Sequence, residues 1–125
     1  MVRSKFVFAA LCLGLAITLL SALPADSPLT EREEAGKKLF RKCAVCHRTD
    51  DKPKKGPGLK GATQRMPGGD WRYRFVRNAQ EVIASGDPYA TRLYVEYKRE
   101  NMTAFPKLTN DQIDQISEYI DAVNR

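Results

Sequence analysis

The chain has 125 residues, enough for one domain, and its 21 Lys and Arg exceed its 15 Asp and Glu to give a formal net charge of +6. Arg3 and Lys5 precede a long apolar run, so the remaining residues carry a net charge of +4. This mild excess lacks the dense cationic stripe with stacking aromatic side chains that is typical of a nucleic-acid-binding protein. We therefore expect no nucleic-acid partner, and interpret the charges as a solvated face that can steer an acidic protein partner.

Residues 1–25 have the pattern of a targeting segment. Two cations are followed by an almost unbroken apolar run of 18 residues, 6–23, as in a secretory signal. This length also reaches the lower limit of a membrane-spanning helix, about 17 residues. We expect a signal peptide that is cleaved near Ala22 or Ala25, with an uncleaved membrane anchor as the alternative. Either outcome places residues 26–125 in the periplasm, because flanking cations stay on the cytoplasmic side.

The first helix of the exported part is predicted to begin at Thr30. The stretch Thr30-Glu31-Arg32-Glu33 matches a capping box, in which the first and fourth side chains bind each other's backbone N–H. Acidic residues occupy the first turn and basic residues the last turns, which complements the helix dipole. Leu39 and Phe40 mark an inward face that leads directly to Cys43.

The pentapeptide Cys43-Ala44-Val45-Cys46-His47 is the strongest motif in the chain. Two cysteines two residues apart and followed by histidine form the C-x-x-C-H pattern of c-type haem attachment. The two sulfurs can form thioethers with the two vinyl groups of one porphyrin, and the histidine is then held beneath the iron as an axial ligand. His47 is the only histidine of the sequence. We therefore predict one covalently bound haem c.

Two other interpretations of the paired cysteines are weaker. A zinc site needs about four ligands, and no second C-x-x-C or further histidine supplies the missing one. A dithiol redox pair is expected to open a helix after a strand, and no strand is predicted before Cys43.

The remaining elements are helices joined by loops. Residues 48–69 are rich in Gly and Pro, which predicts a long functional loop. A second helix is expected from an Asp70 cap through Ile83, and a third from Pro88 to Arg99. A second capping box, Thr109-Asn110-Asp111-Gln112, begins a last helix with a single apolar stripe. No stretch favours a strand, so the sequence predicts an all-α domain with about four helices.

Across residues 30–124 the chain resembles the class I monohaem cytochrome c family. The resemblance implies a cytochrome c-like fold, in which helices and long loops wrap around one haem. Phe40 matches the first-helix aromatic residue that packs on the last helix, where Tyr119 is the corresponding residue, and Gly36 matches the accompanying glycine. Pro57 matches the proline whose carbonyl accepts the other ring N–H of the proximal histidine. Leu59 matches a haem-packing side chain.

The resemblance also implies a methionine as the second axial ligand of the iron. Met102 lies in the family's place for it, the loop before the last helix. Met66 is the rival, because it is followed by proline as in the family's ligand motif. Partners for the haem propionates are expected among four residues of the middle of the chain, which the sequence does not rank: Arg65, Trp71, Arg72 and Tyr73.

These features predict an electron-transfer protein and not an enzyme. With His47 and Met102 both on the iron, no position is open to a substrate, so the chain passes one electron to and from redox partner proteins. The alternative is a haem-based catalytic or gas-sensing module with a labile sixth ligand. A structural or zinc-binding module is the third interpretation.

Overall fold

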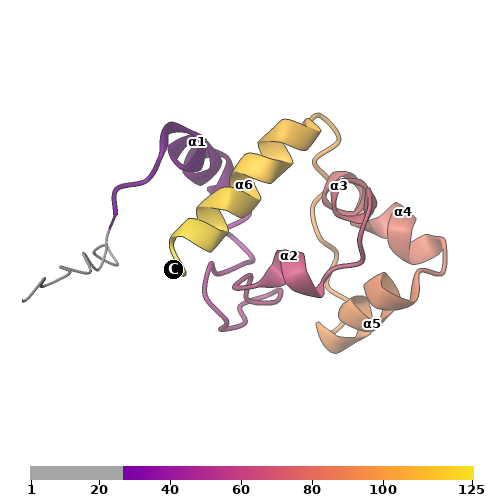
Figure 1. The fold of residues 1–125 in the computed structure, drawn as a ribbon. Helices are drawn as coiled ribbons and strands as arrows, with labels where there is room; N and C mark the ends of the chain where they lie inside the picture. The colour runs from indigo at the N-terminus through magenta and orange to yellow at the C-terminus, as the bar shows by residue number, and fades with distance from the viewer. Residues whose placement is uncertain (1–26) are drawn as a thin grey trace, which may run out of the picture.

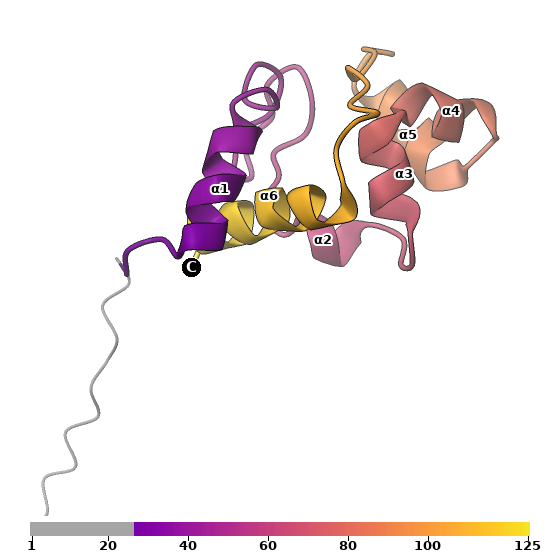
Figure 2. The same cartoon turned by 90° about the horizontal axis from the view of Figure 1, so that it is seen from above.

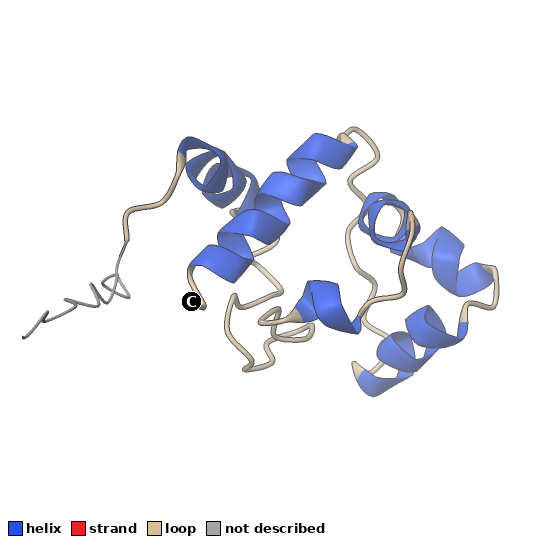
Figure 3. Cartoon of the chain, in the orientation of Figure 1, coloured by secondary structure: helices blue, strands red, loops and turns tan. Residues whose placement is uncertain are grey.

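A computed structural model describes residues 27–125, and the part of the chain that it describes contains helices and loops but no strands (Figure 3). The expected targeting segment lies outside the described residues. Within residues 27–125, no helix has both the length and the apolar character needed to span a membrane. The prediction of an all-α domain is confirmed.

Six helices follow one another in the described residues, two more than expected (Figure 1). In chain order they are α1 Glu31–Phe40, α2 Ala62–Arg65, α3 Trp71–Arg77, α4 Ala79–Ala84, α5 Pro88–Glu96 and α6 Asn110–Ala122.

Both predicted capping boxes are present. The Thr30 side chain accepts from the Glu33 N–H while the Glu33 carboxylate accepts from the Thr30 N–H, and Thr109 and Gln112 repeat the arrangement at the start of α6. Two of the four orphan N–H groups of each helix are thereby satisfied, which fixes where α1 and α6 begin.

The predicted second helix is instead two helices, because Asn78 leaves the helical region of backbone space. Its φ of −156° and ψ of 83° end α3, and its side chain accepts a hydrogen bond of 3.3 Å from the Glu81 N–H to start α4. Asparagine favours such a cap because its side chain competes with the helical backbone bond. Asp70, expected to cap α3 through its side chain, makes no such bond and pairs with Arg74 instead.

Two further boundaries differ from expectation. The long loop contains the single turn α2, which starts after Gly61, a residue with φ of 64° that glycine adopts at little cost. The third predicted helix ends at Glu96, because Lys98 and Arg99 both have positive φ angles.

Two apolar clusters hold the helices together. In the first, α1 crosses α6, where Phe40 packs on Ile116 and Ile120 and its ring centroid lies 5.6 Å from that of Tyr119, as the resemblance implied (Figure 2). In the second, Trp71 of α3 is buried with Val82 and Ala90. Thus α1 and α6 form one side of the domain, and α3, α4 and α5 the other.

Gly36 allows the α1–α6 crossing. A Cβ atom at this position would lie 1.9 Å from the carbonyl oxygen of Gln115. Only glycine lets the two backbones approach this closely.

Candidate functional site

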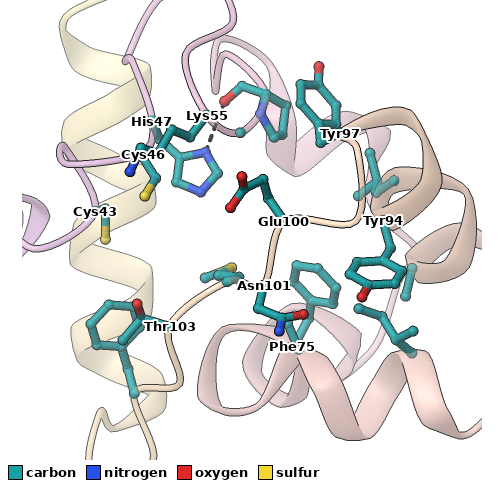
Figure 4. Close-up of a pocket in the computed structure, with 18 of the residues that line it drawn as sticks. Cys43, Cys46, His47, Lys55, Phe75, Tyr94, Tyr97, Glu100, Asn101 and Thr103 are labelled. Atoms are coloured by element: carbon teal, nitrogen blue, oxygen red, sulfur yellow. Dashed lines mark hydrogen bonds between the residues drawn. The ribbon is translucent and has the colours of Figure 1, made fainter.

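The cysteine motif continues α1 as tight turns. The backbone N–H groups of Cys43 and Ala44 both donate to Phe40, and those of Cys46 and His47 both donate to Cys43, at 2.8 to 3.0 Å. Both thiols are free and half-buried, and they lie beside each other with the His47 ring above them (Figure 4). Of the two residues between them, Val45 is 62% exposed, whereas Ala44 packs against the cluster of Phe40, Ile116 and Ile120.

The imidazole of His47 is held from behind by the loop that follows it. Its Nδ1 lies 2.9 Å from the Pro57 carbonyl oxygen, and because a carbonyl can only accept, Nδ1 carries the donated proton (Figure 4). The hydrogen bond expected from the resemblance is therefore present. It leaves Nε2 as the ring nitrogen with a free electron pair for a metal ion.

Gly56 makes room for this arrangement. Its N–H donates to the Cys46 carbonyl oxygen at 2.9 Å, and a Cβ atom there would lie 2.5 Å from Cε1 of His47. Burial lowers the pKa of His47, although its bond to Pro57 acts in the opposite direction, so the ring is neutral at pH 7. Burial likewise raises the pKa of the Cys43 thiol.

The motif opens onto a cleft whose empty volume, including its part open to solvent, is about 800 Å³. Sites that bind small molecules are lined mostly by apolar side chains. The side of this cleft formed by α3, α4 and α5 is largely aliphatic and aromatic, with lining residues Phe75, Ala79, Ile83, Ala90, Leu93, Tyr94 and Tyr97.

Met102 lines this same cleft, together with Asn101, Thr103 and Phe105 of the loop between α5 and α6. Met66 does not. It packs against the cluster of Trp71, Val82 and Ala90 and lines a separate hollow. Of the two methionines in the described residues, only Met102 therefore shares the cleft with His47.

Leu59 is placed differently from Pro57. It packs against the α1–α6 cluster and lines the second hollow, and it is not among the residues that line the cleft. The reason is local: the Leu59 N–H donates to Arg48 at 3.0 Å, while Gly58 lies so close to Asp51 that a Cβ would be 2.4 Å from its carbonyl carbon.

The four residues considered for haem propionates all have protein partners. Arg65 donates to the backbone oxygens of Lys60 and Gly58 in the loop after the motif. The Trp71 indole donates to Asp87 at 3.0 Å, and Arg72 and Tyr73 both donate to Asp114 of α6. These side chains thus tie α2 to the loop after the motif, and α3 to the start of α5 and to α6.

Several lining residues were not recognised from the sequence. Ala79, Tyr94, Glu100 and Asn101 belong to the cleft. Tyr94 follows Ala90 by four residues and Leu93 by one on α5, so the apolar helical spacing carried a signal for it. Glu100 and Asn101 lie in the loop next to Met102, where no periodic pattern exists.

The donor set fits a covalently attached haem. Two free thiols, a neutral imidazole with one nitrogen already bonded, a methionine thioether and an apolar wall all face one cleft. A porphyrin needs these groups: sulfurs for its vinyl carbons, axial donors for its iron and apolar contacts for its faces.

Comparisons with known proteins also point to a haem site. Residues 33–124 match the family model described as Cytochrome c. The chain is similar to the solved structure of cytochrome c from Rhodothermus marinus, at 29% identity over 80% of this chain and 89% of that chain, with a TM-score of 0.61. It is also similar to an engineered cytochrome c from Rhodothermus marinus bound to a carbene intermediate, at 29% identity over 76% of this chain and 83% of that chain, with a TM-score of 0.56. No curated protein sequence matches the chain significantly.

Proposed function

The chain belongs to the cytochrome c family of haem-binding electron-transfer proteins, and we propose that it carries one electron on a single haem whose iron is bound by His47 and Met102. The observation that supports this most is that His47 and Met102 line one cleft while Met66 lies elsewhere. Cys43 and Cys46 would attach the haem through two thioethers.

The residues of the cleft each have a role in this function. The haem supplies an iron that changes oxidation state by one electron. Pro57 fixes the His47 ring and increases its basicity, since its carbonyl accepts the other ring proton. The Met102 thioether, a soft ligand, favours the reduced state and raises the reduction potential. The apolar side chains of α3 to α5 would pack against the haem. His47 and Met102 would together hold the iron and leave no position for a substrate, so we assign a carrier and not an enzyme.

A pair of methionine variants tests the axial ligand. Met102→Ala should abolish the weak long-wavelength sulfur-to-iron absorption band of the oxidised protein, lower the reduction potential and allow the reduced protein to bind carbon monoxide. Met66→Ala is the matched control and should leave all three unchanged. If Met66→Ala shows all three changes and Met102→Ala shows none, Met66 is the ligand. If the unaltered protein already binds carbon monoxide, the sixth ligand is labile and the gas-sensing or catalytic alternative is correct.

A second experiment tests the attachment. Only covalent haem survives denaturation, so the unaltered protein should retain a haem stain on a denaturing gel. The double variant Cys43→Ser/Cys46→Ser should lose it. A stained double variant would exclude both thioethers.

We extend the proposal to location and partners. Residues 1–25 direct export, so that haem is attached in the periplasm, and the N-terminal residue of the mature protein from membrane and soluble fractions would decide between a cleaved signal and an anchor. Lys42 and Lys55 at the cleft support an acidic redox partner, whose rate of electron exchange should fall as ionic strength rises.

A further inference from the structure

The loop that carries Met102 has few hydrogen bonds to the rest of the domain, although Leu108 near its end packs against the cluster of Phe40, Ile116 and Ile120. It runs from the end of α5 past α3 to the start of α6 (Figures 1 and 2). Most of its side chains are exposed, and Met102 itself is half-buried. An axial ligand on such a loop needs something outside the loop to hold it at the cleft.

The loop is also strained where it leaves α5. Lys98 and Arg99 have φ angles of 57° and 60°, the left-handed region that residues with a side chain rarely adopt. Two such residues in succession store conformational energy that a relaxed loop would release. The turn that leads into the loop is therefore strained and is a poor anchor for Met102.

Arg77, the last residue of α3, anchors the part of the loop that follows Met102. Its backbone carbonyl oxygen accepts from the Phe105 N–H at 3.0 Å, and its Nε donates to the Leu108 carbonyl oxygen at 2.9 Å. A second guanidinium nitrogen donates to Asn110 at the start of α6. Within residues 28–125, every other hydrogen bond of residues 100–109 is to a residue between 97 and 113, that is, to the loop itself or to the ends of α5 and α6.

The break at Asn78 is what frees Arg77 for this contact. In a continuous helix the Arg77 carbonyl would accept from the N–H of Glu81, four residues on. Here the Asn78 side chain takes the Glu81 N–H, at 3.3 Å. The carbonyl of Arg77 is then available to Phe105, three residues after Met102.

We infer that Arg77 is a positioning residue for the iron ligand Met102. The inference rests on the proposed function, in which Met102 binds the iron. Arg77 fixes the loop on the side away from the strained turn, so it raises the fraction of molecules in which the sulfur faces the cleft. An external ligand such as imidazole competes for the iron only in the remaining fraction, and its apparent affinity reports that fraction.

The test uses the loaded protein and three variants. Arg77→Gln removes the guanidinium. Arg74→Gln is the matched control, because it removes the same charge from the same helix but pairs with Asp70 and not with the loop. Arg77→Lys keeps the charge and one donor. The readouts are the apparent affinity of the oxidised protein for imidazole, the sulfur-to-iron band, and hydrogen exchange of residues 100–109.

Arg77→Gln should bind imidazole about tenfold more tightly, the effect of losing a charged hydrogen bond from one state. Its loop should exchange hydrogen faster, its band should weaken, and Arg77→Lys should restore part of each. Equal imidazole affinities of Arg77→Gln and Arg74→Gln would overturn the inference. Should Arg77→Gln not fold, Asn110→Ala, which removes the guanidinium's partner at the start of α6, takes its place, and an imidazole affinity equal to that of Arg74→Gln would overturn the inference as well.

The same experiment separates this inference from the proposed ligation. An unaltered protein that lacks the band, and that Met102→Ala does not change, would exclude Met102 as the ligand. Faster hydrogen exchange in Arg77→Gln would then assign Arg77 a structural role only.

Discussion

The indole nitrogen of Trp71 donates a hydrogen bond of 3.0 Å to Asp87, the residue whose carboxylate also accepts from the Ala90 N–H at 2.8 Å. One carboxylate therefore caps α5 and ties it to α3. Phe75 of α3 and Ala90 of α5 both line the cleft. The Trp71–Asp87 bond therefore fixes two sides of the cleft relative to each other. Trp71 also stacks on Phe75, with ring centroids 4.6 Å apart.

Replacing Asp87 with Asn should remove a pH-dependent part of the stability. The bonds from Ala90 and Trp71 lower the pKa of Asp87 from its ordinary value of 3.8, and Arg74 adds a smaller effect. A lowered pKa in the folded protein means that the stabilisation is complete above that ordinary value and is lost as the pH falls through the folded value. Denaturant unfolding at a series of acidic pH values should therefore show a shallower loss of stability for Asp87→Asn.

The control for this measurement is Asp70→Asn. Asp70 stands at the start of α3 but its side chain accepts no capping bond. Its variant removes one carboxylate from the start of α3 without removing a helix cap, so it should lower the stability at neutral pH less than Asp87→Asn does. Identical slopes for Asp87→Asn and the unaltered protein would show that the Trp71–Asp87 bond does not couple to protonation.

Gly56→Ala should disturb the proximal ligand. The new methyl group would lie 2.5 Å from Cε1 of His47, so the ring must move. Overpacking of this kind costs about 1–3 kcal/mol of unfolding free energy. The yield of haem-loaded protein and its reduction potential should both fall. Gly68→Ala is the matched control, since no atom lies within 4 Å of its Cβ position, and it should leave yield and potential unchanged.

Capping boxes and turns could be predicted because their partners lie within four residues of one another. Thr30 with Glu33 and Thr109 with Gln112 are examples, and both helices begin where the sequence indicated. The helix break at Asn78 could not be predicted, because apolar residues keep a helical spacing from Trp71 through Ile83 across the break. The hydrogen bond from the Phe105 N–H to the Arg77 carbonyl oxygen joins distant residues, so only the folded chain shows it.

The site residues likewise divide into those with partners nearby in the sequence, which could be predicted, and those with distant partners, which could not. The motif and the His47–Pro57 bond belong to one local segment, and the expected contact is present. The partners of Trp71 and Arg72 lie 16 and 42 residues away, which is why the sequence could not exclude them as propionate ligands. Met102 was expected over Met66 from its place before the last helix, and the fold adds that only Met102 of the two lines the cleft with His47.

Gly36→Ala should weaken the packing of α1 on α6. Alanine is the better helix former by about 1 kcal/mol. Here that gain is outweighed, because the added Cβ would lie 1.9 Å from the backbone oxygen of Gln115, which cannot rotate away. We expect a net loss of about 1–3 kcal/mol in urea unfolding. Lys38→Ala on the exposed face of α1 should change stability little, and equal values for the two variants would contradict the close crossing.

Arg99→Gly should stabilise the protein. Glycine accepts a φ of 60° without the steric penalty of a side chain, and this gain exceeds the entropy that it adds to the unfolded chain, for a net gain of about 0.5 kcal/mol or more. Arg92→Gly, in the middle of α5, should instead lower the free energy of unfolding by about 1 kcal/mol. If both variants lose stability, the turn after α5 is not strained.

The ion pair between Arg125 and Glu33 has a practical consequence. It joins the last residue to the first turn of α1, whereas Cys43 and His47 lie beyond the far end of that helix. The preceding residue, Asn124, donates from its side chain to the Thr49 carbonyl oxygen at 2.8 Å, and Thr49 lies two residues after His47. The carboxyl-terminal end therefore holds both the start of α1 and the loop after the haem motif, so surface immobilisation through this end should place that loop close to an electrode.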